Sequence, residues 1–231
     1  MCLITQMKTS MSTRLALFDL DNTLLAGDSD HAWGEFLIAK KLVDEDTHRK
    51  TNDAHYKDYH AGKLDIHAYV EFTITPILSL SYEERNDLRR EFMETFIHPM
   101  VLDKAQSLIN SHKQAGDCCV IITATNEYVT APIAKIFNVH QLLATELEIF
   151  RGRFTGKISG MPCFRKGKVE RLKLWIANQT ESYDLAASIF YSDSINDLPL
   201  LEKVAQGVAV DPDEKLEQIA RKRNWEIISL R

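Results

Sequence analysis

The sequence has few cysteines, no long apolar run, no internal repeat and no low-complexity segment. Its four cysteines form no C-x-x-C pair, which argues against a zinc site, and the adjacent Cys118 and Cys119 are poorly placed to bridge each other. No apolar segment is long enough to span a bilayer, and residues 1–13 lack the regions of an export signal. These absences predict reduced thiols, a cytoplasmic location and no membrane partner.

The charge balance also argues against one class of partner. The chain carries 28 Lys and Arg against 33 Asp and Glu, a formal net charge of −5. Proteins that bind a phosphate backbone usually present a basic surface, so we expect no nucleic-acid partner. The length of 231 residues suits one domain with an insertion or two small domains. Nothing in the sequence indicates the oligomeric state.

Strand-like apolar runs alternate with helical patterns over most of the chain. Such alternation predicts parallel β-α-β units and an α/β fold with a Rossmann-like parallel sheet. A β-hairpin is expected where two short apolar runs flank an Arg-Gly turn. The expected strands of the sheet are 14–20, 117–125, 188–193, 207–210 and 225–230, and the expected hairpin is 145–158.

One long segment interrupts this alternation with helical patterns and no convincing strand. Ser81 with Glu84 forms a capping box that predicts the start of its last helix. We expect a helical-bundle cap at 28–100, inserted into a core domain made of 14–27 and 101–231. The expected helices of the cap are 31–43, 48–64, 65–78 and 81–96.

Polar side chains follow three of the predicted strands. Asp19 and Asp21 end the first strand, Thr123 and Thr125 end the second, and Asp193 ends the third. Ligands of open parallel sheets bind outside the carboxyl ends of the strands, so these residues are expected to meet. Three clustered carboxylates repel one another unless a cation lies between them, and oxygen ligands suit Mg²⁺. The pattern predicts a site for Mg²⁺ and a phosphate group.

Four short motifs in this order resemble the signature motifs of the haloacid dehalogenase superfamily. They are DLDNT at 19–23, Thr123 after an apolar strand, Lys168, and DSIND at 193–197. The helical insertion between the first two motifs resembles the small-cap subgroup that contains phosphoserine phosphatases. The resemblance spans nearly the whole chain and implies a phosphatase with a Rossmann-like core.

The resemblance implies a role for each aspartate. Asp19 would be the nucleophile that attacks a phosphate ester and forms an aspartyl-phosphate. Asp21 would protonate the leaving alcohol and then deprotonate the attacking water. Asp19, the backbone carbonyl of Asp21, and Asp193 would hold Mg²⁺, which lowers the repulsion between nucleophile and phosphate.

The remaining motif residues are expected around the phosphate. The resemblance implies that Thr123 and the backbone amides near Ala124 bind phosphate oxygens. Lys168 would stabilise both the phosphate and the carboxylates. Asn196 is expected to bind the phosphate or to support the site from outside, and Asp197 to hold Lys168 or the waters of the metal.

Each of these residues also has a purely structural interpretation. Asp19 and Asp21 could cap a helix after the strand, and Asp197 could cap the helix that follows it. Thr123 alone is typical of a β-strand. Choosing Lys168 over Lys166 depends on the family pattern and on its place before an apolar helical face. The order of all four motifs is what favours the functional interpretation.

The predicted cap carries two further groups of polar and aromatic residues. His55, Tyr56, Tyr59 and His60 are spaced for pairing on one helix, which favours packing in the cap over metal binding. Phosphoserine phosphatases carry a Glu soon after the first motif that meets the substrate's amino group. Here the nearest acids are Asp28, Asp30 and Glu35, and the chain resembles a branch that includes histidinol-phosphate phosphatases. These acids are candidates to meet an ammonium or imidazolium group.

The function predicted from the sequence is Mg²⁺-dependent hydrolysis of a small phosphorylated metabolite, with phosphoserine and histidinol phosphate as candidate substrates. A phosphotransferase or mutase would share every motif and differ only in the phosphoryl acceptor. A non-catalytic binding protein on the same scaffold is disfavoured, because it would have no reason to retain mutually repelling carboxylates. The acidic balance and the predicted cap disfavour large substrates such as nucleic acids or phosphoproteins.

Overall fold

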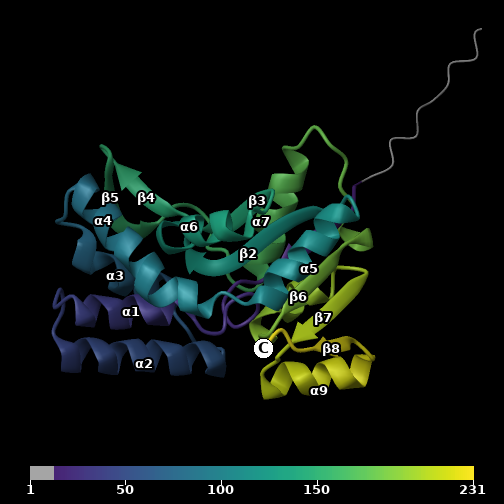
Figure 1. Ribbon diagram of the computed structural model, residues 1–231, viewed down its shortest axis with the longest axis horizontal. Coiled ribbons are helices and arrows are strands. Elements are labelled where there is room, and N and C mark those ends of the chain that lie inside the picture. The colour runs from purple at the N-terminus through teal and green to yellow at the C-terminus, as the bar shows by residue number, and fades with distance from the viewer. Residues whose placement is uncertain (1–12) are drawn as a thin grey trace, which may run out of the picture.

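The computed structural model describes residues 13–231, and their centre is a six-stranded sheet (Figure 1). All neighbouring strands in it run parallel, in the order β3-β2-β1-β6-β7-β8. The order reverses direction between β1 and β6, which is where open α/β sheets bind their ligands. The predicted Rossmann-like α/β fold is confirmed. The strands are β1 Leu15–Phe18, β2 Cys118–Asn126, β3 Gln141–Thr145, β6 Ile189–Ser192, β7 Gln206–Val210 and β8 Glu226–Ile228.

Both faces of the sheet are covered, which explains the continuous apolar strands of the sequence. Alternate residues of β1 point to opposite faces: Ala16 and Phe18 join one apolar cluster, and Leu15 and Leu17 join the other. The helices α5 and α6 pack on the first face, and α7, α8 and α9 on the second. These helices are α5 Asp103–Gln114, α6 Glu127–Phe137, α7 Lys166–Ala177, α8 Leu198–Leu201 and α9 Glu214–Arg223.

Of the five α-helices between β1 and β2, the first four lie to one side of the sheet (Figure 1). Each begins at a side chain that accepts backbone N–H groups: Asp28, Asp44, Asp65 and Ser81. The predicted capping box of Ser81 and Glu84 is present. After the fourth helix the chain passes through a π-helical turn, 93–97, and a 3₁₀ turn, 98–100. The four helices are α1 Ser29–Ala39, α2 Glu45–Ala61, α3 Ile66–Ile74 and α4 Tyr82–Phe92.

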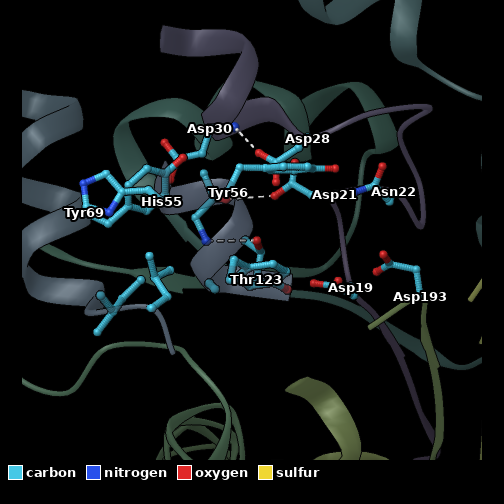
Figure 2. A pocket seen from close by; sticks show the side chains of 15 residues that line it. Asp19, Asp21, Asn22, Asp28, Asp30, His55, Tyr56, Tyr69, Thr123 and Asp193 are labelled. Atoms are coloured by element: carbon cyan, nitrogen blue, oxygen red, sulfur yellow. Dashed lines mark hydrogen bonds between the residues drawn. The ribbon is translucent and has the colours of Figure 1, made fainter. Parts of the chain in front are cut away.

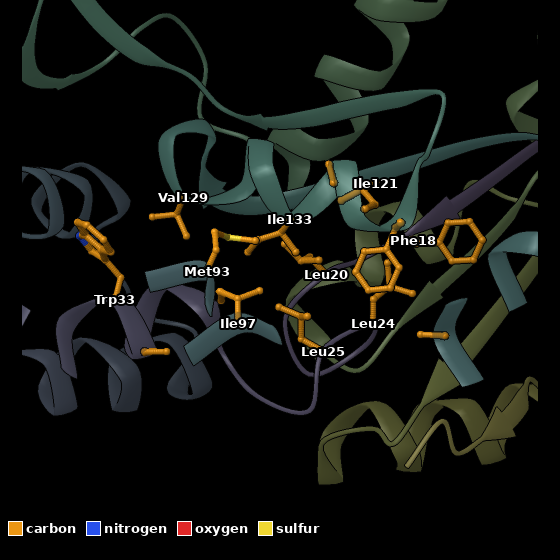
Figure 3. Packing of buried hydrophobic residues seen from close by; sticks show 14 of the residues in the cluster. Phe18, Leu20, Leu24, Leu25, Trp33, Met93, Ile97, Ile121, Val129 and Ile133 are labelled. Carbon is orange, nitrogen blue, oxygen red and sulfur yellow. The ribbon is translucent and has the colours of Figure 1, made fainter. Parts of the chain in front are cut away.

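The inserted helices share one apolar cluster with the sheet (Figure 3). Trp33 of α1 and Met93 after α4 lie in the same cluster as Phe18 of β1 and Ile133 of α6. Helix α2 differs, because none of its residues belongs to this cluster. Its contacts with the rest of the molecule combine hydrogen bonds, such as that from Asn52 to the carbonyl of His31, with aromatic pairs, such as His48 stacked on Phe72.

Two parts of the sequence prediction need comment. The hairpin is present as β4 Leu147–Phe150 and β5 Arg153–Ile158, with positive φ at Arg151 and Gly152 of its turn. The assignment of Thr145 to the hairpin was wrong, because it ends β3, a strand that the sequence did not predict. This edge strand has only five residues and is followed almost directly by β4. The sequence therefore shows one continuous strand-like segment where the structure has two strands. Cys118, Cys119 and Cys163 are buried free thiols, as expected, and Cys2 lies outside the described residues.

No helix within residues 13–231 has both the length and the apolar character that a membrane span requires.

Candidate active site

The first two aspartates leave β1 at the reversal point of the sheet. The backbone N–H of Asp19 still donates to the carbonyl of Tyr191, at 2.9 Å, so Asp19 stays beside β6. Asp193 follows the end of β6, and the hydroxyl of Thr23 binds it twice. That hydroxyl lies 3.2 Å from Oδ1 of Asp193 and accepts its backbone N–H at 3.0 Å. These contacts hold the two strand ends, and both their carboxylates, in one crevice.

Lys168 enters this crevice from the first turn of α7. Its side chain is only 2% exposed, and Nζ donates to Oδ1 of Asp19 at 2.8 Å and to Oδ2 of Asp197 at 2.7 Å. Asp197 stands at the start of α8 but caps no helix with its side chain, which instead accepts the hydroxyl of Ser192 at 2.8 Å. The neighbouring Lys166 is exposed. The structure therefore places Lys168, and not Lys166, against Asp19.

Burial dominates the electrostatics of this cluster. It raises the pKa values of Asp19 and Asp193, and the Lys168 ammonium group partly opposes it at Asp19. Burial also raises the pKa of Asp197 to about 6 against the influence of Lys168. Burial lowers the pKa of Lys168, but the carboxylates of Asp19 and Asp197 outweigh it and the net shift is upward. One ammonium group thus faces three carboxyl groups, an arrangement that favours binding of a further cation.

Asp21 points to the other side of the same crevice. Its Oδ1 accepts the backbone N–H of Ser29 at 2.7 Å, and its Oδ2 accepts the hydroxyl of Thr125 at 2.8 Å. Burial, and then the negative charge of Asp28, raise the pKa of Asp21 to about 6. A carboxyl group with this pKa can both give and take a proton near neutral pH.

The end of β2 forms the wall opposite the aspartates. Its pairing with β3 shifts register between Ile122 and Asn126, which marks a bulge. Thr123, Ala124 and Thr125 consequently all line the pocket, although neighbours in a regular strand point to opposite faces. Helix α6 begins directly after the bulge. The site therefore holds the hydroxyl of Thr123 and a helix start, both suited to an anion.

Asn196 lies outside this pocket in the structure. Its Nδ2 donates to the carbonyl of Tyr59 at 3.0 Å, and its Oδ1 accepts Nε of Arg165 at 3.1 Å. Arg165 also donates to the carbonyl of Gly62. Asn196 and Arg165 thus bind the last carbonyls of α2, where the partial negative charge of a helix accumulates. Phosphate binding by Asn196 stays a prediction.

The pocket has a core wall and a wall made by the inserted helices (Figure 2). The space inside it, counted together with the open solvent at its mouth, is about 520 Å³. Part of the second wall was predicted from the sequence, but Tyr69 was not. The signal that could have identified it is its spacing from Ile66, which places both residues on one face of a helix. Of the predicted aromatic group, His60 does not line the pocket. The wall of the inserted helices consists of Asp28, Asp30, His55, Tyr56, Tyr59, Leu64, Ile66 and Tyr69.

The three acids suggested for a cationic substrate group separate into two sets. Asp28 and Asp30 line the pocket, whereas Glu35 does not and instead pairs with Arg49 of α2 at 3.0 Å. Asp28 accepts the N–H groups of Asp30 and His31 as the N-cap of α1. Asp30 is 3% exposed, and its Oδ1 accepts Nδ2 of Asn126 at 3.3 Å. Burial and the charge of Asp28 raise its pKa well above the ordinary value.

The donor set of the crevice fits a magnesium ion. Asp19 and Asp193 line the same pocket (Figure 2), and the predicted third protein ligand is the backbone carbonyl of Asp21. No three His, Cys, Asp or Glu side chains in residues 13–231 form a metal cluster. Only two of the predicted ligands are side chains, which leaves positions for water and phosphate oxygens, the coordination that Mg²⁺ prefers.

Comparison with known proteins identifies the family. The model of the haloacid dehalogenase-like hydrolases matches residues 16–202, a span that holds all four motifs. The chain belongs to this family. It is 41% identical over 219 residues to a histidinol-phosphatase of Neisseria meningitidis, covering 94% of this chain and 99% of that one. It is 30% identical over 229 residues to a phosphoserine phosphatase of Mycobacterium tuberculosis, covering 95% of this chain and 71% of the relative.

Two solved structures share the fold. A Bordetella pertussis Tohama I protein of unknown function superimposes with a TM-score of 0.88 at 41% identity, over 96% of this chain and all of the other. A phosphoserine phosphatase solved as a phospho-aspartyl intermediate analogue gives a TM-score of 0.68 at 16% identity, over 96% and 95%. The second similarity is one of fold alone. The prediction of a phosphatase of the haloacid dehalogenase family is confirmed.

Proposed function

We propose that this haloacid dehalogenase-family phosphatase hydrolyses a small phosphomonoester through phosphoryl transfer to Asp19. One observation carries the proposal. The buried Asp19 contacts Lys168 at 2.8 Å, while the carboxyl group two residues later, Asp21, lines the same pocket and is held by its own donors. A nucleophile and a separate acid thus lie in one pocket beside a fixed positive charge.

The reaction has two steps. In the first, a carboxylate oxygen of Asp19 bonds to phosphorus as the ester P–O bond breaks, and Asp21 gives its proton to the leaving oxygen. In the second, Asp21 takes a proton from water, whose oxygen attacks phosphorus and breaks its bond to Asp19. Phosphate leaves, and both aspartates return to their starting states. An Asp two residues after the nucleophile is what makes the second step fast.

The other groups in and beside the pocket stabilise charge on the phosphoryl oxygens. Lys168 holds Asp19 in place and adds a positive charge that is already desolvated. Thr123 and the backbone near Ala124 face the same space and supply donors. Asp19, Asp193 and the Asp21 carbonyl would hold Mg²⁺, which supplies a Lewis acid for the phosphate oxygens. Asp197 keeps Lys168 oriented by accepting its second hydrogen bond.

For the substrate we favour histidinol phosphate over phosphoserine. The relative that matches almost from end to end is a histidinol-phosphatase. The pocket offers two carboxyl groups, Asp28 and Asp30, for an ammonium group. It also offers four flat rings for an imidazole, those of His55, Tyr56, Tyr59 and Tyr69. Phosphoserine would add a carboxylate. The described lining contains no Lys or Arg to receive it.

A substrate panel tests this proposal. Phosphate release is measured with Mg²⁺ from histidinol phosphate, phosphoserine, sugar phosphates and nucleotides, for the wild type and Asp19→Asn. We expect histidinol phosphate to give the highest kcat/KM, with activity lost in Asp19→Asn and in EDTA. Alcohol release without equal phosphate release would indicate transfer to another acceptor and contradict hydrolysis. Unchanged activity in Asp19→Asn would contradict the mechanism.

Matched variants test the recognition of the substrate's cationic group. Asp30→Asn keeps the size of the side chain and removes the carboxylate from the pocket, whereas Glu35→Gln makes the same change outside it. We expect Asp30→Asn to lower kcat/KM for histidinol phosphate at least about tenfold, since the ammonium group loses a charged partner. Glu35→Gln is the control. Equal effects of the two variants would contradict recognition by the pocket acid.

A further inference from the structure

The two oxygens of the Asp21 carboxyl group are held by groups from distant parts of the chain. Oδ1 accepts the backbone N–H of Ser29, the first residue of α1, at 2.7 Å. Oδ2 accepts the hydroxyl of Thr125, near the end of β2, at 2.8 Å. Thr125 and Ser29 lie outside the four motifs, which assign neither of them a role. One anchor comes from the inserted helices and the other from the sheet.

Two anchors have a specific effect on an aspartate. Rotation about the bond between Cβ and the carboxyl carbon is broad and weakly restricted in Asp side chains. One hydrogen bond limits this rotation on one side only, whereas donors on opposite oxygens fix the plane of the carboxyl group. A general acid must direct its proton along the line to the leaving oxygen, so the orientation of this plane affects the rate.

The bulge of β2 is what brings the Thr125 hydroxyl to Asp21. The register shift between Ile122 and Asn126 lets successive residues face the pocket. The backbone N–H of Thr125 donates to the hydroxyl of Thr123 at 3.2 Å, so the two threonines hold each other. Thr125 is 6% exposed. It is a fixed, desolvated donor, placed between the wall expected to bind phosphate and the proposed acid.

We propose that Thr125 is a positioning residue that fixes the plane of the Asp21 carboxyl group toward the leaving oxygen of the ester. This inference rests on the proposed function, in which Asp21 is the acid. Thr125 itself neither gives nor takes the proton. Loss of its hydroxyl should lower the rate of phosphoryl transfer to Asp19. The loss should be larger for esters whose leaving oxygen depends more on protonation.

Two aryl phosphates of different leaving-group acidity test this inference. The p-nitrophenolate ion leaves almost without protonation, whereas the more basic oxygen of phenyl phosphate needs a proton. The quantity to compare is kcat/KM with Mg²⁺, because in a two-step reaction it reports only the steps through phosphoryl transfer to Asp19. We expect Thr125→Val and Thr125→Ala to lose about tenfold more activity on phenyl phosphate than on p-nitrophenyl phosphate. Thr125→Ser, which keeps the hydroxyl, should restore the wild-type ratio.

A second buried threonine provides the matched control. The Thr130 hydroxyl donates to the carbonyl of Asn126 at 3.0 Å within α6 and does not line the pocket. Thr130→Val removes a buried hydroxyl equally, and should leave the ratio of the two esters at its wild-type value. Equal losses on both esters in the Thr125 variants would assign Thr125 a structural role. That result would overturn this inference and leave the proposed function standing. Absence of turnover of both esters by the wild type would overturn the proposed function, and this inference with it.

Discussion

The ammonium group of Lys168 lies 2.8 Å from Oδ1 of Asp19, with both side chains almost completely buried. The same group lies 2.7 Å from Asp197. Lys168 thus supports two carboxylates that have little water around them. Removal of such a shared charge affects the stability of the fold as well as the chemistry of the site.

The first prediction concerns this shared charge. Lys168→Met leaves Asp19 and Asp197 buried without their cation, and should lower the free energy of unfolding by about 3–5 kcal/mol in metal-free buffer. Phosphatase activity should fall at least about 100-fold, because a charge that stabilises the transferring phosphoryl group is lost. Urea unfolding and phosphate release measure the two effects. Lys166→Met, at an exposed position, is the control and should change stability by less than about 0.5 kcal/mol.

The second prediction concerns the pH dependence of the first step. Burial and Asp28 raise the pKa of Asp21 to about 6, and the acid acts in its protonated form. The kcat/KM for phenyl phosphate should therefore fall as pH rises above about 6. Asp28→Asn removes a negative charge that raises this pKa, so the decline should move to lower pH. Asn is also a good N-cap, so α1 should remain intact. If Asp28→Asn left the pH dependence of kcat/KM unchanged, a group other than Asp21 would be responsible for the decline above about pH 6.

The third prediction concerns magnesium and needs no substrate. Mg²⁺ between Asp19 and Asp193 would relieve the repulsion between two buried carboxylates and raise the melting temperature. Asp193→Asn should abolish this increase, and should melt higher than the wild type in EDTA because one of the repelling charges is gone. Potassium chloride at the same ionic strength is the control. An equal increase in the wild type and in Asp193→Asn would place the magnesium elsewhere.

The fourth prediction concerns the contact between α2 and the core. Arg165 binds the carbonyl of Gly62 and the side chain of Asn196, so Arg165→Ala should free the last turn of α2. Amide hydrogen exchange in residues 56–62 should become faster, and KM should rise more than kcat falls, because this helix carries part of the pocket wall. Lys166→Ala, one residue away and exposed, should change neither quantity. Unchanged exchange in Arg165→Ala would show that other contacts hold this turn.

The parts of the site that the sequence predicted are those in which polar residues interrupt apolar strands. Asp19, Thr123 and Asp193 each follow a buried run, and the parallel order of the sheet brings these ends together. Lys168 was harder to select because Lys166 lies beside it. The decision depended on the family pattern, and the structure places Lys168 against Asp19.

Other features leave little trace in the sequence. The contact of Asn196 with α2 uses a backbone carbonyl, that of Tyr59, and a carbonyl belongs to every residue alike. The contact of Thr125 with Asp21 depends on a bulge, and no residue type is required for one. Glu35 was a candidate for the substrate pocket because only its distance from the first motif was known. In the structure it pairs with Arg49 from the next helix and does not line the pocket.

Helix α2 is attached differently from the other inserted helices, and this affects how a substrate can enter. Detaching α1 or α4 would expose apolar side chains of the shared cluster to water, whereas α2 contributes none to it. Its contacts include ion pairs and hydrogen bonds, such as Arg49 with Glu35 and Arg165 with Gly62. Water and dissolved salt can replace such contacts at small cost. Helix α2 also packs through rings, such as His48 on Phe72, but it shares no apolar cluster with the sheet. We therefore expect its displacement to cost less than that of α1 or α4, and we expect this cost to fall as ionic strength rises.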